Sequence, residues 1–403
     1  MKTFSRSCVA LLGLLVPLTL AAAPAPARSM SAALQPFIDQ SLFAGAVTMV
    51  VNRDKVVDVT AVGSADLATR SAMRTDSLFW IASMTKPMTV TALMMLVEEG
   101  KVSVDDPVEK FLPEFKGQML LAGKNEHGVV LRKPSHPILV REIISHTSGL
   151  PKRCPLDLPK GEALPLRDLV RSYPLSHLET EPGTAYNYSN PGLNTAGRII
   201  EVVSGMPYEQ FMSRRLFEPL GMKDTTFFPT QEQLRRLATN YNMRTDRTGL
   251  DPVRIGPLTY PLDAPQRHPL PAGGLFSTAS DVARFCQMLL AGGVNQDKRY
   301  VAEATIKLMT SKQTAASIRN RYGFGWALGL GKDREAYGHA GALRTLMFID
   351  PKENIAGIFL IQRQGAWVTK EEKEVFPAFF QAAYNVAGIT VSAANLADPE
   401  GAR

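Results

Sequence analysis

Ser77-Leu78-Phe79-Trp80-Ile81-Ala82-Ser83-Met84-Thr85-Lys86 is the stretch from which the rest of this chain can be understood. Its apolar run ends at Ser83, and a segment of helical character continues from Thr85 to Glu99. Residues three apart share one face of a helix, so the Ser83 hydroxyl and the Lys86 amine are expected to be neighbours. An amine beside a hydroxyl at a helix start can make a serine nucleophilic. Taken alone, the four residues from Ser83 to Lys86 also fit a helix-capping serine followed by a surface lysine.

Length and composition describe an ordinary globular protein. The 403 residues can form a large core, and we expect two domains. Hydrophobic residues make up 45% and charged residues 21% of the chain. The formal charge of +7 comes from dispersed basic residues, which indicates a solvated surface and not a nucleic-acid-binding tract.

Residues 1–27 have the pattern of a signal peptide. Lys2 and Arg6 precede an apolar core from Cys8 to Leu20, and the small residues that follow offer cleavage sites. The alternative is an uncleaved anchor, but this core is short for a membrane span, and no other segment approaches the necessary length. We therefore expect a bacterial protein that is exported to the periplasm or secreted, with no membrane span in the mature chain.

Two cysteines, Cys154 and Cys286, lie beyond the expected signal peptide. In an oxidising compartment they could form a disulfide, but the sequence does not place them together. Their spacing does not suggest metal ligands, and we expect neither a metal nor another cofactor.

Segments of strand character lie at both ends of the chain, and helical segments lie between them. The expected strands are 44–51, 56–63, 322–330, 345–349 and 355–362, and the expected helices are 30–41, 85–99, 192–204, 208–216, 281–291 and 375–387.

The simplest fold that uses these segments is of the α+β class. An antiparallel sheet built from N- and C-terminal segments (30–83 and 281–390) is flanked by helices, and an all-helical domain (84–280) is inserted into it. Residues 391–403 are expected to be a disordered tail. A cleft between the two parts is then the expected site.

A second group of candidate site residues lies in Tyr186-Asn187-Tyr188-Ser189-Asn190. A tyrosine near a lysine cation has a stabilised phenolate, so Tyr188 can take the proton of the serine. Asn190 can donate to Lys86 or to a substrate. The alternative is that Tyr188 is a half-buried core aromatic and that Asn190 caps the next helix.

A third group lies in Tyr337-Gly338-His339-Ala340-Gly341-Ala342. Glycine lets a backbone approach a ligand closely. If this segment is an edge strand that lines the cleft, the amides of Ala342 and Ser83 form an oxyanion hole. The alternative is an ordinary turn between strands.

These three groups, in this order, resemble the motifs of the serine β-lactamase and penicillin-binding-protein superfamily, which uses Ser-x-x-Lys, a Tyr- or Ser-based motif and Lys-Thr-Gly. The tyrosine form is similar to the branch of class C β-lactamases, family VIII carboxylesterases and D-stereospecific peptidases. The resemblance spans nearly all of the mature chain, with support from 79–86, 144–150, 181–190 and 272–275. It implies that Ser83 is acylated and that Lys86 and Tyr188 share the proton transfers, while Asn190 has an orienting role.

The third motif departs from the family pattern. His339 and Gly341 occupy the Lys and Gly positions of Lys-Thr-Gly. In the lactamases that lysine is a permanent cation that helps to hold the substrate carboxylate, whereas a histidine, with a pKa of about 6.5, is mostly neutral at pH 7. The change favours a neutral ester or amide over a carboxylate-bearing β-lactam.

The sequence therefore predicts an exported serine hydrolase with a Ser83 acyl-enzyme, most simply a carboxylesterase on small esters. The alternatives are a β-lactamase or a D-alanyl/D-amino-acid peptidase with the same machinery, and a non-catalytic penicillin- or peptide-binding protein. The expected partner is a small-molecule ester or amide and not a nucleic acid; the oligomeric state is left open.

His146 is interpreted as a structural loop residue. The chain has no Gly-x-Ser-x-Gly, His-Glu-x-x-His or phosphate-loop motif, which disfavours a lipase-type triad, a zinc hydrolase and a nucleotide enzyme.

Overall fold

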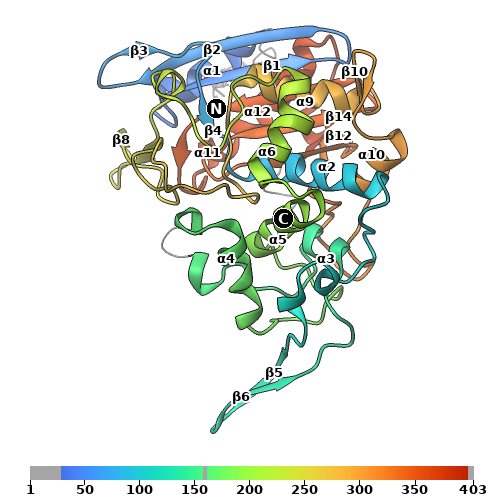
Figure 1. Ribbon diagram of the computed structural model, residues 1–403. Helices are drawn as coiled ribbons and strands as arrows, with labels where there is room; N and C mark the ends of the chain where they lie inside the picture. The colour runs from blue at the N-terminus through green and yellow to red at the C-terminus, as the bar shows by residue number, and fades with distance from the viewer. Residues whose placement is uncertain (1–28, 158–160, 398–403) are drawn as a thin grey trace, which may run out of the picture.

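An antiparallel sheet dominates the upper half of the molecule (Figure 1). The computed structural model describes residues 29–157 and 161–397. Within these ranges the sheet has eight strands in the order β17-β12-β13-β14-β15-β1-β2-β3. Their bounds are β1 Gly45–Val51, β2 Val56–Asp66, β3 Ser71–Ala72, β12 Ala327–Lys332, β13 Ala336–Ala340, β14 Leu346–Asp350, β15 Ile355–Leu360 and β17 Leu396–Ala397. The prediction that both ends of the chain build one sheet is confirmed.

The two ends of the chain meet where β1 pairs with β15, with Val47 opposite Leu360. Every residue of β1 is buried, because helices cover both faces of the sheet at this point. Side chains alternate between the faces: Val47 and Met49 pack into one hydrophobic cluster and Ala46 into the other. The helices α1 (Met30–Asp39) and α12 (Val375–Val386) cover one face, and α9 (Ala279–Leu290) covers the other.

Between the sheet segments, α2 (Thr85–Glu98) packs against a second long helix. Twelve of the fourteen residues of α2 are buried, as expected of a helix that is enclosed on all sides, and its main partner is α5 (Asn190–Ser204). The shorter helices are α3 Val140–Ile144, α4 Leu166–Arg171, α6 Tyr208–Met212, α7 Glu218–Leu220, α8 Gln231–Leu234, α10 Glu303–Met309 and α11 Lys370–Lys373.

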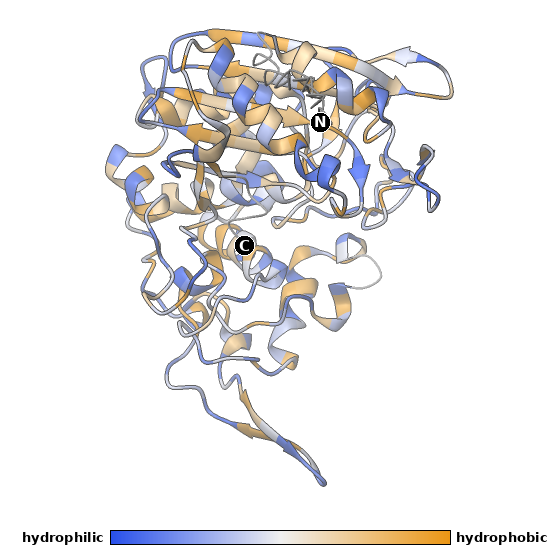
Figure 2. Cartoon of the chain, turned by 180° about the vertical axis from the view of Figure 1, so that it is seen from behind, coloured by the Kyte–Doolittle hydropathy of each residue, from blue (hydrophilic) through white to orange (hydrophobic). Residues whose placement is uncertain are grey.

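The region between the sheet segments is not entirely helical, contrary to the expectation for 84–280. Strands β5 (Leu120–Asn125) and β6 (Gly128–Arg132) form a hairpin that projects from the lower end of the molecule (Figure 1). Figure 2 shows hydrophobic colour along part of this hairpin, and every residue of β6 is exposed. A smaller sheet joins β7 (Tyr241–Met243) to β8 (Leu250–Pro252) and β16 (Arg363–Gln364). These strands are short and lie within irregular or helical surroundings, and β16 pairs with β7 from a distant part of the chain, so the sequence pattern did not reveal them.

Two short strands bring the borders of the inserted region together. Strand β4 (Phe79–Trp80) pairs with β9 (Phe276–Ser277), so the residues before Ser83 lie against the glycine-rich stretch 272–275. One further short pair, β10 (Val294–Asn295) with β11 (Lys298–Arg299), follows α9. The pairing of β4 with β9 places the chain entry and the chain exit of the inserted region beside Ser83.

The ends of the chain differ in how far the structure describes them. The expected signal peptide, residues 1–27, lies outside the described residues. The tail was expected to be disordered from residue 391, but up to Ala397 it forms a 3-10 turn and then β17, which pairs with β12. Among the helices of the described ranges, none combines the length and the apolar character that crossing a bilayer requires. Cys154 and Cys286 are both buried, and they do not form the disulfide that the sequence left open.

Candidate active site

Ser83 and Lys86 are hydrogen-bonded neighbours at the start of α2. The Lys86 Nζ donates to the Ser83 Oγ over 3.0 Å and to the Ala272 carbonyl oxygen over 2.6 Å. Lys86 is fully buried, and the Ser83 side chain does not cap the helix. The alternative of a capping serine and a surface lysine is therefore wrong.

The backbone that presents Ser83 is strained and held by hydrogen bonds. Ala82 has a φ of 47°, in the left-handed region that a residue with a Cβ rarely adopts. The Thr85 hydroxyl donates to the Ala82 carbonyl oxygen over 2.6 Å, and the Leu275 amide donates to the Thr85 Oγ1 over 3.2 Å. The strain persists because the glycine-rich stretch and α2 together fix the turn.

Tyr188 lies against Lys86 and is packed between two histidines. The Lys86 Nζ is 4.7 Å from the centroid of the Tyr188 ring. The ring of His146 is 4.2 Å away, centroid to centroid, at a tilt of 33°, and the ring of His339 is 6.3 Å away. The structure thus brings Tyr188 into one cluster with Ser83 and Lys86, which come from a separate part of the chain.

His146 is part of this cluster, although the sequence analysis interpreted it as a structural loop residue outside the site. It is fully buried, has a φ of 62°, and its Nδ1 accepts the Ser189 amide over 3.1 Å. Burial lowers the pKa of His146 well below its usual value, and the Lys86 cation lowers it further. The ring is therefore neutral, and it supports the face of Tyr188. Its loop position agrees with the sequence interpretation, but the packing on Tyr188 could not be inferred from a His-Thr-Ser-Gly segment.

His339 lies behind Tyr188 on β13, which is an interior strand and not the expected edge strand. Strands β12 and β14 pair with β13 on its two sides, and β12 is in turn covered by β17. The His339 Nδ1 lies 2.8 Å from the Ala340 carbonyl oxygen, so this nitrogen carries the proton and donates it. The Nε2 then accepts the Tyr322 hydroxyl over 3.0 Å. Only 5% of His339 is exposed, and both ring nitrogens are engaged. No motif in the sequence pointed to Tyr322 as the hydrogen-bond partner of His339.

Gly341 is required by the close approach of the β13–β14 turn to the residues before Ser83. A Cβ at this position would lie 2.1 Å from the Thr345 Oγ1 and 2.5 Å from the Ile81 carbonyl oxygen. The next residue, Ala342, lines the same cavity as Ser83. Within the described part of the chain, neither the Ser83 amide nor the Ala342 amide donates to another backbone group. Two such amides, on residues that line one cavity, are candidates to bind a developing oxyanion.

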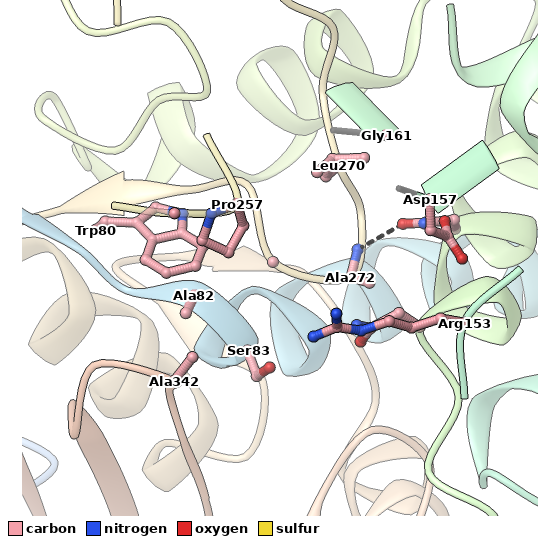
Figure 3. Close-up of a pocket in the computed structure, with 14 residues that line it drawn as sticks. Trp80, Ala82, Ser83, Arg153, Asp157, Gly161, Pro257, Leu270, Ala272 and Ala342 are labelled. Atoms are coloured by element: carbon pink, nitrogen blue, oxygen red, sulfur yellow. Dashed lines mark hydrogen bonds between the residues drawn. The ribbon is translucent and has the colours of Figure 1, made fainter. Parts of the chain in front are cut away.

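Ser83 opens into a cavity of about 350 Å³ (Figure 3). Trp80 and Leu270 provide apolar wall, and Arg153 extends across the cavity from the loop after α3. Asn190 also lines it, with a buried Oδ1 that has no hydrogen-bond partner among the residues that the structure describes. Asn190 is the first residue of α5, and Ser189 is the residue that caps this helix, so the capping alternative for Asn190 is wrong. Sequence reasoning did not single out Trp80 or Arg153, since neither belongs to a spaced motif.

Comparison with known proteins gives matches over most of the chain. A family model described as β-lactamase matches residues 30–375. The protein Rv1367c of Mycobacterium tuberculosis is 32% identical over 366 residues, which cover 82% of this chain and 88% of the relative. The lovastatin esterase of Penicillium rubens is 27% identical over 377 residues, covering 83% of this chain and 92% of the esterase.

Solved structures share the fold. The structure of EstCE1, described as a hydrolase with promiscuous acyltransferase activity, matches with a TM-score of 0.74 at 24% identity, covering 88% of this chain and 97% of EstCE1. At that identity the likeness speaks for the fold alone. Further sequence relatives carry the names of an N-acetylmuramyl-L-alanine amidase from Bacillus subtilis and a putative D-alanyl-D-alanine carboxypeptidase from Salmonella.

Proposed function

Because this chain belongs to the β-lactamase family of serine hydrolases, we propose that it is a carboxylesterase that cleaves small esters through an acyl-enzyme on Ser83. The family match confirms the resemblance read from the three motifs, and the relatives include proteins named as an esterase, an amidase and a D-Ala carboxypeptidase. The observation that carries the proposal is the 3.0 Å hydrogen bond between Lys86 and Ser83, formed beside the Tyr188 ring.

The proposed reaction has two symmetrical halves. The Ser83 Oγ attacks the ester carbonyl carbon while its proton passes to the phenolate of Tyr188, which the Lys86 cation stabilises. The amides of Ser83 and Ala342 donate to the oxygen that becomes negative. The C–O bond to the alcohol then breaks, and the alcohol takes up the proton. A water molecule repeats the sequence on the acyl-enzyme and releases the acid.

The third motif favours esters over β-lactams in this proposal. The ring of His339 is buried, and Tyr322 and the Ala340 carbonyl engage both its nitrogens. An imidazole of ordinary pKa, about 6.5, is mostly neutral at pH 7. A neutral group at this position offers no permanent cation to the carboxylate of a β-lactam. Asn190 is the proposed orienting residue, because it lines the cavity beside Ser83 and its Oδ1 has no hydrogen-bond partner in the described part of the chain.

The test compares three substrate classes on the purified mature protein: a p-nitrophenyl ester, a chromogenic cephalosporin and a D-alanyl peptide. Turnover is recorded together with intact mass. We expect an ester burst with a covalent adduct that is lost in Ser83→Ala. Cephalosporin or D-peptide turnover of comparable efficiency would replace the esterase by a β-lactamase or D-peptidase, and the absence of both turnover and adduct would favour a binding protein.

Export is the second part of the proposal, and it rests on the pattern of residues 1–27. Expression of the full chain in a Gram-negative host, followed by fractionation and N-terminal sequencing, tests it. We expect periplasmic protein that begins within or just after the small residues 21–27. Full-length protein retained in the cytoplasm would contradict export.

A further inference from the structure

We infer that Arg153 forms a subsite for an anionic group, so that the preferred esters carry a carboxylate several bonds from the scissile carbonyl. This inference rests on the proposed function, because it names the substrate class of the same cavity. The three motifs offer no permanently charged residue that could bind a substrate anion. The third motif has His339 at the position where the family has a lysine.

The position of Arg153 supports the subsite. Arg153 lines the same cavity as Ser83, and Figure 3 shows its guanidinium extending from the far wall into the cavity, on the side toward Ser83. Trp80, Pro257 and Leu270 form apolar parts of the wall. A short acyl or alkyl chain along this wall would connect an ester carbonyl at Ser83 with an anion at Arg153.

Arg153 forms no close ion pair in residues 29–157 and 161–397, although its charge acts on Asp157. The structure records neither an ion pair nor a hydrogen bond of its side chain within those ranges. Nearby, the guanidinium of Arg267 is paired with Glu162 over 3.0 Å, and both side chains are almost fully buried. The contrast indicates that Arg267 is a structural cation, whereas Arg153 is available to a ligand.

Asp157, the carboxylate closest to Arg153 in the cavity wall, is engaged elsewhere. Its Oδ2 accepts the Cys154 amide over 2.7 Å, and its Oδ1 accepts the Tyr173 hydroxyl over 3.0 Å. Burial raises the pKa of Asp157, whereas its hydrogen bonds and the charge of Arg153 lower it, so Arg153 attracts Asp157 without forming a close ion pair with it. A substrate carboxylate can therefore take both parallel N–H bonds that a guanidinium offers.

The experiment uses ester pairs that differ only in charge. On the acyl side, 4-nitrophenyl hydrogen adipate is compared with 4-nitrophenyl hexanoate; on the alcohol side, 4-acetoxybenzoate is compared with 4-acetoxybenzamide. The readout is the ratio of kcat/KM for the anionic and the neutral ester of each pair, after subtraction of uncatalysed hydrolysis. We expect the ratio of one pair to fall about tenfold in Arg153→Glu. A fall of this size corresponds to the loss of one charge-assisted hydrogen bond.

Lys152→Glu is the matched control, because it makes the same charge change on the adjacent, exposed residue that does not line the cavity. We expect its ratios to stay within about twofold of the native protein, because Lys152 does not line the cavity and solvent screens its charge from a ligand there. Equal effects of the two variants, or unchanged ratios in Arg153→Glu, would overturn the subsite.

A binding measurement separates failure of the subsite from failure of the proposed hydrolysis. In the Ser83→Ala protein, calorimetry compares adipic acid monoamide with hexanamide, which differ in the same carboxylate. We expect the acid to bind about tenfold more tightly and Arg153→Glu to remove the difference. Equal affinities would overturn the subsite, whereas a preference for the acid in a protein without ester turnover would contradict only the esterase.

Discussion

The Thr345 hydroxyl donates to the Ile81 carbonyl oxygen over 3.2 Å and so joins the third motif to the residues before Ser83. Thr345 and Ile81 are both fully buried, and 264 positions of sequence separate them. The same Ile81 carbonyl oxygen lies against Gly341. The distance between the Ser83 and Ala342 amides, the proposed oxyanion hole, therefore depends on this contact.

Gly341→Ala is expected to lower kcat/KM for a p-nitrophenyl ester by about 100-fold, because a displacement near 1 Å misaligns the two amides. The added Cβ cannot fit beside the Thr345 Oγ1 and the Ile81 carbonyl oxygen, so the turn must move. Steady-state kinetics measures the loss, and circular dichroism checks that the fold is kept.

Gly256→Ala is the control for this prediction. Gly256 also lines the cavity, but a Cβ there would meet no atom within 4 Å. We expect less than a threefold change in this variant. A Gly341→Ala protein as active as Gly256→Ala would refute the requirement for a glycine in the third motif.

His146→Asn is expected to lower kcat/KM about tenfold, because it removes the ring that supports Tyr188. A tenfold loss corresponds to the free energy of one aromatic contact. Asparagine tolerates the left-handed φ of 62°, and its amide oxygen can still accept the Ser189 amide, so the loop should fold. Arg70→Asn makes the same replacement at another left-handed residue, on an exposed turn, and should leave the kinetics unchanged. Native activity in His146→Asn would show that Tyr188 needs no support from the ring.

His339→Lys is expected to shift preference toward carboxylate-bearing substrates, because it restores a cation in the third motif. The measurement is the ratio of kcat/KM for a cephalosporin and a p-nitrophenyl ester, which we expect to rise about tenfold. His127→Lys, on the exposed hairpin turn, is the control for total charge. An unchanged ratio would count against the assigned effect of His339 on specificity.

Asp281 predicts a pH dependence of stability. Burial raises the pKa of Asp281 from 3.8 to about 6, although its carboxylate accepts the Asp224 amide and the Thr225 hydroxyl. A folded-state pKa above the unfolded value means that the native protein binds the extra proton, so this contribution to stability is present below pH 3.8 and is lost as the pH rises to about 6.

Asp281→Asn should therefore be relatively more stable at neutral pH than at low pH. Between pH 4 and pH 6.5 we expect the free energy of unfolding of the native protein to fall relative to the variant by on the order of 2 kcal/mol, and to stay level above that range. Urea unfolding at several pH values measures this difference. A difference that does not change with pH would mean that Asp281 titrates normally in the folded protein.

The local part of the site was predictable because helix geometry alone creates it. Ser83 and Lys86 are three residues apart at a helix start, and that spacing places them on one face in any fold that keeps the helix. The sheet was predictable for a similar reason: β1, β2, β14 and β15 are apolar runs separated by turns. Short strands such as β5 and β6 have too few alternating apolar residues to be predicted from the sequence in the same way.

The sequence by itself determined the identity and the order of the three motifs, and through them the family. Only the tertiary structure decided which other residues join them. His146, Tyr322 and Arg153 come from separate loops, and no periodicity relates them to Ser83. Whether β13 is an edge or an interior strand also depended on its pairing with β12, which no local signal specifies. Contacts within one helix follow from backbone geometry, whereas contacts between distant segments follow from how the whole core packs.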